Sequence, residues 1–505
     1  MVASGLFSNN MNKSSPFKSN SVKLIFAAAT LQFVLVWSVA RAQQYSHFII
    51  DEHADNAGNV FSQSGSSAAF DGKNYMVVFA DDRDSYKNIY GARINPEGTV
   101  LDPHSFIIGS GICGDKGFTD VAFGSETFLV VWQDSRYYKD LRDGIYGTLV
   151  NREGVASDTA GFLINNHATD QQFPKVCYGN SLYLVVWQEV MSDTASAIYG
   201  ARMSADGTVL DSDGILISYG QNASAPAIAF DGNNFLVVWI SDSTVYGARV
   251  GQDGVLHDQS PVAISSALGA GCAHPAVAFD GAAYLVAWQD AHNGNADVYA
   301  ARLSTTGAVL DQLNIPVSTH ASNQRNPSVI FDGVDFLVVW EDDRNAASDL
   351  YGARVSIDGQ VYPELNLVTN AGESYGPGLA HGAGNQVLLH YTGSWQVQIN
   401  DQMYGAERIW CSLLNESQVG IEEMSLSPSV QTYPNPCHDV LHLMFKDDLL
   451  PAEASVLNLL GEEVKRIHIS SGDNFIPVSD LDAGIYFCKL IGNIPAGAIR
   501  FEVQH

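Results

Sequence analysis

Basic residues are scarce in this sequence. Lys and Arg together number 26 against 55 Asp and Glu, so the formal net charge at pH 7 is −29. A chain this acidic repels phosphate backbones, which argues against nucleic acid as a partner. The acidic surface favours solubility, and it could also attract cations.

Cysteine is also rare, and the spacing of the six cysteines matches no paired metal motif such as CxxC. The cysteines are Cys113, Cys177, Cys272, Cys411, Cys437 and Cys488. Cys437 and Cys488 could form a disulfide within the C-terminal segment, although spacing alone does not determine connectivity. The sequence therefore predicts no bound metal.

Motifs of catalytic or cofactor-binding chemistry are missing. The sequence holds no Asp-x-Asp-x-Asp-Gly calcium loop, no His-Glu-x-x-His zinc motif and no phosphate-binding loop. We therefore predict no catalytic residues and no cofactor.

Only one long hydrophobic run is present, from Leu24 to Ala40. Basic residues precede this run, and Ala40-Arg41-Ala42 follows it with the small-x-small pattern of a signal cleavage site. We predict a signal peptide over residues 1–42, recognised by the Sec machinery, with cleavage between Ala42 and Gln43. The alternative is a membrane anchor, since about 17 apolar residues are at the short limit for a span. Later segments are less apolar, so we expect no transmembrane segment in the mature chain.

One repeated phrase dominates the rest of the sequence, and it is clearest at Phe230-Asp231-Gly232-Asn233-Asn234-Phe235-Leu236-Val237-Val238-Trp239. Related phrases begin at Phe70, Phe123, Tyr178, Phe279, Phe331 and, in a weaker form, His381. The copies lie about 50 to 55 residues apart, which is in the range of β-propeller repeats.

Each repeat divides into four short strands, called A to D below. In the fourth repeat they are 227–230, 235–239, 245–250 and 262–264. Asp-Gly pairs between A and B, and between C and D, favour tight hairpins because Gly accepts positive φ. Strand B is apolar at successive positions, as in a strand that is covered on both faces. The repeats therefore predict all-β blades of four antiparallel strands, stacked on one another.

Strand D is missing after the seventh repeat, whereas an orphan strand of the D type, Phe48-Ile49-Ile50, precedes the first strand A. An open ring would leave two unpaired sheet edges, which natural proteins avoid. We therefore predict a seven-bladed β-propeller over residues 43–412, closed by the N-terminal strand, which should pair with the last blade near Tyr404.

The remaining chain differs in character. Residues 413–430 are polar and predict a linker, and the short strands of 431–505 predict a small β-sandwich. Tyr433-Pro434-Asn435-Pro436, the turn at 458–461 and Leu481-Asp482-Ala483-Gly484-Ile485-Tyr486 together resemble the C-terminal sorting domains (type A) of the type IX secretion system. The closing Gln504-His505 departs from the basic ending that these domains often have.

This resemblance implies passage from the periplasm through the outer membrane by the type IX secretion machinery. It also implies removal of the C-terminal domain, after which the protein is secreted or attached to the outer-membrane surface. The propeller repeats resemble those of exported bacterial proteins, and this second resemblance implies no particular activity.

The candidate binding face is the end of the ring that carries the B–C and D–A loops. These loops are longer and richer in charge than the A–B and C–D turns, and functional groups gather on variable loops held by a rigid scaffold. The B–C loops offer Asp81, Asp82, Arg83, Asp134, Arg136, Glu189, Asp242, Asp290, His292, Asp342, Asp343 and Arg344. The D–A loops add His53, His167, His274 and His320.

Regular recurrence favours a structural role for many of these residues. The acidic residue after strand B recurs in most blades, as do arginines and tyrosines in strand C. The arginines are Arg93, Arg202, Arg249, Arg302 and Arg354, and the tyrosines are Tyr90, Tyr146, Tyr199, Tyr246, Tyr299, Tyr351 and Tyr404. Because catalytic sites are asymmetric, we expect Asp–Arg pairing or loop capping, with the tyrosines packed between blades. The least regular units are residues 139–143 and Trp395 with Asp401, where a ligand site should be sought first.

We therefore predict a secreted or cell-surface propeller that binds an unidentified extracellular ligand, a glycan or a protein, without catalysis. One alternative is a propeller-type polysaccharide hydrolase or lyase, which would need charged residues from different blades to converge on the axis. Another alternative is a structural component of the cell envelope.

Overall fold

The computed structural model describes most of the chain between Tyr45 and Gln504. The described ranges are 45–51, 61–111, 113–136, 142–192, 195–220, 222–258, 260–266, 271–311, 313–345, 347–369, 372–399, 402–414, 430–433, 437–445, 453–457, 463–468, 473–481, 484–491 and 498–504. The predicted signal peptide and its cleavage site at Ala42 and Gln43 therefore lie outside the described residues. Among the described residues, no helix has the length and hydropathy needed to cross a bilayer.

Seven four-stranded antiparallel sheets form the propeller predicted from the repeats. The first six are β2–β5 (Gln63–Phe70, Tyr75–Asp81, Asn88–Ile94, Phe106–Gly109), β6–β9 (Lys116–Phe123, Thr127–Asp134, Gly144–Asn151, Phe162–Leu163), β10–β13 (Asp170–Gly179, Leu182–Ser192, Ala195–Ser204, Ile215–Gly220), β14–β17 (Ser224–Phe230, Asn234–Ser241, Thr244–Gly251, Val262–Ala263), β18–β21 (Ala273–Phe279, Ala283–Asp290, Asp297–Ser304, Ile315–Ser318) and β22–β25 (Gln324–Phe331, Phe336–Asp342, Asp349–Val355, Leu365–Val368). The seventh consists of β26 (Ser374–His381), β27 (Val387–Ile399), β28 (Gln402–Leu414) and β1 (His47–Ile49).

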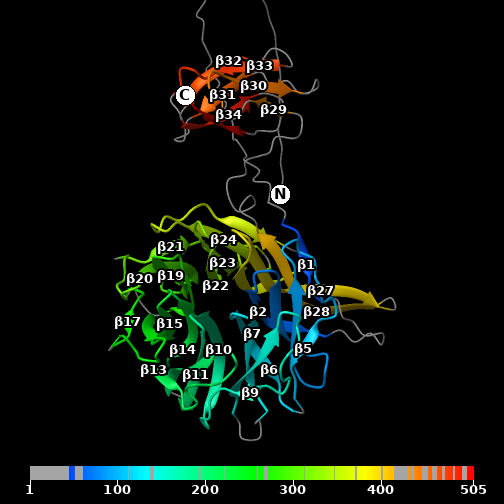
Figure 1. Ribbon diagram of the computed structural model, residues 1–505, viewed down its shortest axis with the longest axis vertical. Coiled ribbons are helices and arrows are strands. Elements are labelled where there is room, and N and C mark those ends of the chain that lie inside the picture. The colour runs from blue at the N-terminus through cyan, green and yellow to red at the C-terminus, as the bar shows by residue number, and fades with distance from the viewer. Residues whose placement is uncertain are drawn as a thin grey trace, which may run out of the picture. The chain divides into compact units, whose positions relative to one another are not determined.

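Strand A of each blade contacts strand A of the next, so that β2, β6, β10, β14, β18, β22 and β26 form a closed circle. Figure 1 shows β10, β14 and β22 nearer the centre, with β13, β17 and β21 at the rim. Strand B is buried along its length, as in β3, because each blade is covered on both faces by its neighbours. Its tryptophans (Trp132, Trp187, Trp239, Trp288, Trp340) are among the largest fully buried side chains.

The N-terminal strand closes the ring as predicted. β1 pairs antiparallel with β28, with Phe48 opposite Cys411 and Ile49 opposite Trp410. The same register joins Phe106 and Ile107 to strand C of the first blade, so β1 occupies the place of a true strand D.

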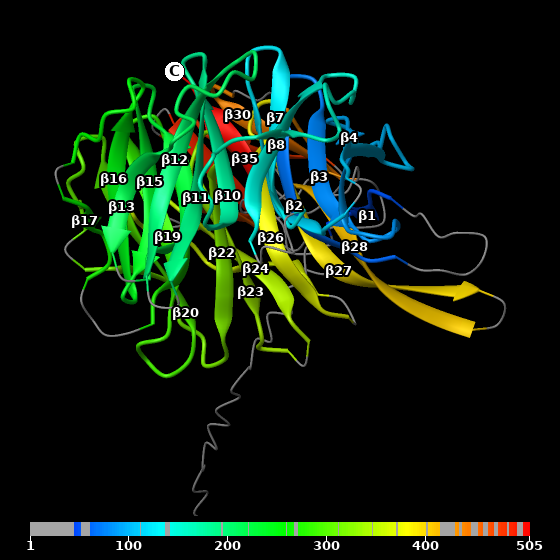
Figure 2. The same cartoon turned by 90° about the horizontal axis from the view of Figure 1, so that it is seen from below.

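β1 pairs with the predicted strand, β28, but not at the predicted position near Tyr404. Trp410 lies opposite Tyr391 at the position of the strand C tyrosines, whereas Tyr404 lies opposite Val397 farther along the β27–β28 hairpin. Figure 2 shows this hairpin (yellow) extending past the neighbouring blades. The sequence Tyr404-Gly405-Ala406 imitates the repeated strand C phrase, six residues before its structural equivalent.

Every strand A carries a β-bulge near its start, at the end of the ring where the D–A loops enter. One residue of each bulge has positive φ, and these bulge residues are Gly65, Phe118, Phe173, Ala225, His274, Asn326 and Gly376. A bulge redirects side chains within a strand. The seven bulges therefore change the direction of side chains at seven positions around the predicted binding face.

The arginines of strand C form ion pairs, but with a different set of acids from those that follow strand B. Arg249 pairs with Asp258, nine residues later, at 2.7 Å. Its Nη1 donates to the carbonyl of Thr305 in the next blade at 3.0 Å. Arg93, Arg202 and Arg302 repeat both contacts, so these arginines fasten neighbouring blades together.

The C-terminal region contains two further sheets. One has the order β29 (Val430–Tyr433), β30 (Val440–Phe445), β33 (Asp473–Pro477), and the other β32 (Glu463–His468), β31 (Glu453–Leu457), β34 (Gly484–Ile491), β35 (Ala498–Val503). Side chains of both sheets share one buried cluster, which is consistent with the predicted sandwich. Cys437 and Cys488 both belong to this cluster and no disulfide joins them.

Candidate functional site

The acidic residue that ends strand B forms a closed corner with the basic residue two positions later. In the second blade, Asp134 Oδ2 lies 2.6 Å from Arg136 Nη2 and accepts a hydrogen bond from Trp132 Nε1 at 2.9 Å. The guanidinium of Arg136 lies over the ring of Tyr146, 3.6 Å from its centroid. Asp134 is fully buried, so this corner leaves no carboxylate oxygen open to a ligand.

The same corner recurs in other blades. Arg83 contacts Asp81 at 2.5 Å and stacks on Tyr90, and Arg344 contacts Asp342 at 2.6 Å and stacks on Tyr351. Burial opposes ionisation of Asp342, but hydrogen bonds from Arg344 and Trp340 outweigh it and hold the pKa of this carboxyl below its ordinary value. In the fifth blade His292 takes the place of the arginine and contacts Asp290 at 2.8 Å. In the third blade the partner of Glu189 is His167, which comes from the D–A loop and lies 2.7 Å away.

Three further candidates hold loops or turns. Asp82 accepts a hydrogen bond from Ser62 N at 2.7 Å, and Asp343 forms an ion pair with Arg325 at 2.7 Å. Asp242 lies in the two-residue turn between β15 and β16 with φ of 45°, one position beyond that of the acidic corner.

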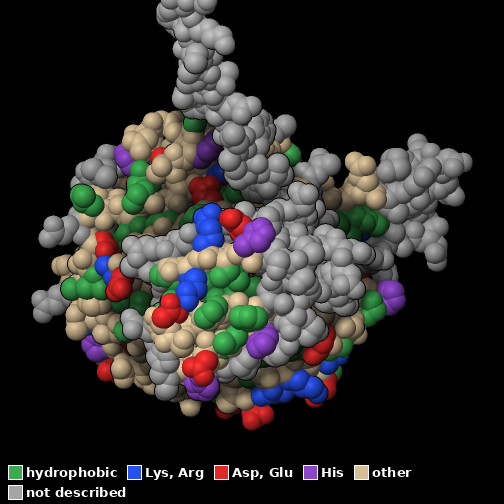
Figure 3. Space-filling view, turned by 90° about the horizontal axis from the view of Figure 1, so that it is seen from above, with side chains coloured by type: hydrophobic (Ala, Val, Ile, Leu, Met, Phe, Trp, Pro, Cys, Tyr) green, Lys and Arg blue, Asp and Glu red, His purple; other side chains and the backbone are tan. Residues whose placement is uncertain are grey.

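The candidate histidines are dispersed. His167 belongs to the corner of Glu189, His320 bonds Ser322 Oγ at 2.9 Å, and His274 is a bulge residue of β18 and not part of a loop. His53 lies outside the described residues. Among the described residues, no group of three His, Cys, Asp or Glu side chains could hold a metal ion. On the face drawn in Figure 3, acidic side chains form small groups, several of them beside basic or histidine side chains.

The seventh blade breaks the pattern. Gly393 stands where other blades carry the acid, two residues after Tyr391, and Trp395 stands where Arg136 and Arg344 stand. Trp395 instead packs on Arg408, whose Cζ lies 4.7 Å from the ring centroid. Trp410 replaces the strand C tyrosine. Because residue 395 is a tryptophan and not an arginine, it cannot place a guanidinium on the ring of Trp410, as Arg136 does on Tyr146.

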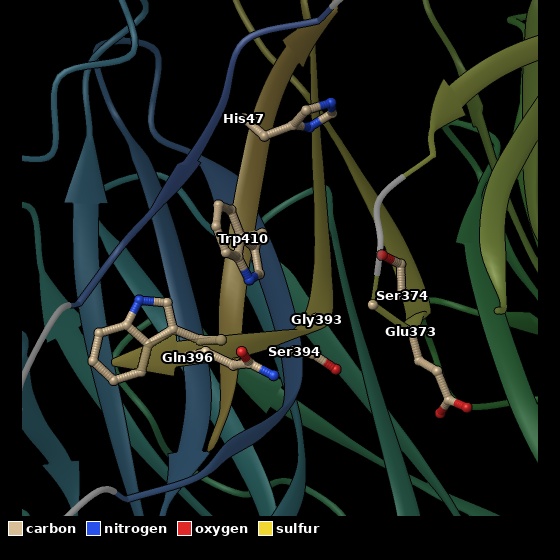
Figure 4. A pocket seen from close by; sticks show the side chains of 9 residues that line it. His47, Glu373, Ser374, Gly393, Ser394, Gln396 and Trp410 are labelled. Atoms are coloured by element: carbon tan, nitrogen blue, oxygen red, sulfur yellow. The ribbon is translucent and has the colours of Figure 1, made fainter. Parts of the chain in front are cut away.

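A pocket of about 430 Å³ opens at this break, in the seventh blade and beside the loop that leads into β26. It is lined by His47, Gly372, Glu373, Ser374, Gly393, Ser394, Trp395, Gln396 and Trp410. Figure 4 shows His47 and Trp410 on one side, Ser374 and Glu373 on the other, and Gly393, Ser394 and Gln396 on β27. A Cβ on Gly393 would lie 2.9 Å from Trp410 Cδ1, so this glycine is needed to leave the pocket open.

Two polar atoms in the pocket lack partners among the described residues. Ser374 is fully buried, and its Oγ makes no hydrogen bond. His47 Nδ1 is buried in the same way, and burial lowers the pKa of this imidazole. An unsatisfied buried polar group costs free energy, and a ligand hydroxyl that bonded it would recover that cost.

Of the residues that line this pocket, the sequence predicts a ligand site only at Trp395. Asp401 and residues 139–141, where a ligand site was also expected, lie outside the described residues. The available signal was the loss of the acid–basic pair at Gly393 and Trp395, a loss that the fourth repeat shares at Ser241 and Ser243. His47 gave no local signal, because it reaches the site only through closure of the ring.

Comparisons with known proteins identify the C-terminal region. Residues 431–495 match the family described as secretion system C-terminal sorting domain. No curated protein sequence matches the chain.

Several solved structures show a distant likeness to the chain. A subtype N10 neuraminidase-like protein of A/little yellow-shouldered bat/Guatemala is 11% identical with a TM-score of 0.40, over 73% of this chain and 97% of the other. An exo-1,5-α-L-arabinanase from a bovine ruminal metagenomic library is 10% identical with a TM-score of 0.34, over 52% and 100%. A GH43 endo-arabinanase from Bacillus licheniformis is 14% identical with a TM-score of 0.33, over 51% and 100%. Likeness at this level does not extend to ligand or activity.

Proposed function

This chain carries a type IX sorting domain at residues 431–495, which directs it to the cell surface or into the medium, and we propose that its propeller is a non-catalytic glycan-binding module. The binding site is the pocket in the seventh blade, beside the loop that leads into β26. The observation that carries the proposal is Ser374, which lines this pocket and whose buried Oγ has no hydrogen-bond partner among the described residues.

The lining of the pocket suits a sugar ring. Trp410 and Trp395 offer flat apolar surfaces, on which the C–H face of a pyranose can pack. Ser374, Ser394 and Gln396 offer hydroxyl and amide groups for the sugar hydroxyls. Binding pockets commonly combine such aromatic walls with a few placed polar groups.

The same lining argues against glycoside hydrolysis. Most glycosidases use two carboxyl groups about 5 to 10 Å apart on either side of the scissile bond. Of the residues that line the pocket, Glu373 alone carries a carboxylate. Several acids of the other blades are held in ion pairs by arginine, as at Asp134 and Asp342.

The test is a glycan array with the full-length protein, followed by calorimetry with the best ligand. Ser374→Ala and Gln396→Ala should each lower affinity about tenfold, while Ser374→Ala leaves the melting temperature unchanged because its hydroxyl has no partner to lose. Ser125→Ala, in the exposed turn between β6 and β7, is the matched control.

Two results would overturn the proposal. One is an array without any ligand whose affinity depends on Ser374 or Gln396. The other is release of reducing sugar at a rate that Glu373→Gln abolishes, which would make the pocket an active site.

A further inference from the structure

The residue after the strand B aromatic contacts the bulge of the next blade. Gln133 Oε1 accepts the N–H of Phe173 at 3.3 Å, and Gln289 Oε1 accepts the N–H of Asn326 at 3.4 Å. Glu341 accepts the N–H of Gly376 at 2.7 Å in the same way. A long acceptor side chain thus fills the space above the bulge in these blades.

The first blade lacks this side chain, because Ala80 stands at the position of Gln133. Alanine has no acceptor and little volume. A second pocket, of about 330 Å³, opens there between the first and second blades, lined in part by Ala80, Lys87, Asp115, Lys116 and Phe118.

Lys116 is the unusual member of this lining. It is 1% exposed, and the hydrogen bond of its Nζ runs to the carbonyl of Gly114 at 3.3 Å. Within the described residues, no carboxylate lies within ion-pair distance of this ammonium. Of the two nearest acids, Asp134 is held by Arg136, and Asp115 accepts the backbone N–H of Lys87 at 2.9 Å.

A buried ammonium without a counter-ion is unfavourable, and burial lowers the pKa of Lys116 accordingly. In three other blades the equivalent position is Gln, at Gln63, Gln171 and Gln324, which needs no counter-ion. The burial of a lysine at this position therefore needs an explanation, and a bound anion that pairs with its ammonium group would provide one.

The bulge of β6 forms another side of this second pocket. Phe118 has φ of 47° and is 54% exposed, and its ring packs edge-on against Phe173 with centroids 4.7 Å apart. The left-handed backbone of such a bulge can turn successive N–H groups toward one side, an arrangement that favours anions. An exposed phenyl ring beside an ammonium suits a ligand with an apolar face and a negative group.

We propose that this second pocket binds the anionic group of an acidic saccharide, a carboxylate or a sulfate ester, through Lys116, with the sugar ring against Phe118. Lys87 adds a second positive charge at the rim. The net charge of −29 repels anions at long range, so recognition depends on these short-range contacts. This site is separate from the pocket at Trp410 and does not rest on it.

The experiment measures binding of glucuronate, glucose 6-sulfate and glucose to the full-length protein by calorimetry. Two variants restore the residue found in sibling blades and should keep the fold: Lys116→Gln, as in Gln63, and Ala80→Gln, as in Gln133. Each should weaken binding of the anionic sugar about tenfold or more, because it removes a charge-assisted bond or fills the pocket. Lys73→Gln, which removes an exposed charge from the turn between β2 and β3, should change nothing.

The tighter of the two acidic sugars identifies the anion. Glucose binding as tightly as glucuronate and glucose 6-sulfate, or unchanged affinity in both Lys116→Gln and Ala80→Gln, would overturn the proposal. Ser374→Ala, which tests the first pocket, should leave binding of the acidic sugar unchanged. The two sites are thereby tested separately.

Discussion

The guanidinium of Arg83 lies 2.6 Å from the carboxylate of Asp51, and the same guanidinium lies 2.5 Å from Asp81. Asp51 follows the closing strand β1, whereas Arg83 belongs to the first blade. Ser105 Oγ donates a further hydrogen bond to Asp51 at 2.5 Å. The closing strand is therefore fixed to the blade at its other side as well as paired with β28.

Removing this carboxylate should loosen the closure. The Asp51 side chain is fully buried and Arg83 is 10% exposed, so Asp51→Ala should lower the free energy of unfolding by about 3 kcal/mol. Asp343→Ala breaks a more exposed pair with Arg325 and should cost less than about 1 kcal/mol. Urea titration compares the two, and equal losses would contradict a special role for Asp51.

Deleting residues 45–52 should destabilise the whole ring and promote aggregation. The deletion removes β1 and leaves the edge of β28 unpaired, a template for pairing with other chains. Calorimetry and light scattering measure both effects. A variant with an unchanged melting temperature would show that closure contributes little.

His390 should make the propeller sensitive to acid. Burial lowers the pKa of His390 to about 3, with nearby Lys175 as a smaller cause, from an ordinary value of 6.5. Between these values the unfolded chain binds a proton that the folded chain does not, so stability falls as the pH falls through this window. The loss is about 1.4 kcal/mol per pH unit, and it ends near the folded pKa.

A consensus substitution tests this prediction. His390 occupies the position of Val131 and Val339, and a Cβ on Gly378 would clash with its ring. His390→Val should therefore flatten the dependence of unfolding free energy on pH between about 6 and 4. An unchanged slope would assign the acid sensitivity to other groups, such as His47 and His274, whose pKa values are also lowered by burial.

The strand C arginines should contribute to blade cohesion. Arg249→Met loses the bonds to Asp258 and to the carbonyl of Thr305 in the next blade, at a cost of about 2 kcal/mol. Arg325→Met, at a pair whose arginine is 42% exposed, should cost less than about 1 kcal/mol. The midpoint of chemical denaturation ranks the two variants, and a reversed ranking would refute the assignment.

The repeat made the fold predictable, but not the partners of its charges. Seven blades and their closure followed from one phrase and an orphan strand, Phe48-Ile49-Ile50. Tyr404 was misplaced because a copy of the strand C phrase lies within the hairpin extension. The partner of Glu189 proved to be His167, which approaches from another loop, a contact that no spacing in the sequence indicates.

The positions of the two pockets could be predicted from the sequence in part. Each opens where a small residue replaces a repeated large one, Gly393 for the acid and Ala80 for the glutamine. Aligning the repeats position by position would have singled out both. Their depth and lining depend on residues such as His47 and Lys116, whose places only the assembled ring determines.

The pairing of β1 with β28 joins residues about as far apart as the propeller allows, as Ser46 and Ser412 are separated by 366 positions. The strand that is synthesised first is thus the strand that is paired last. Every shorter nascent chain must carry an exposed sheet edge until Ser412 has emerged from the ribosome. A holding chaperone in the periplasm would find its clearest target in that interval.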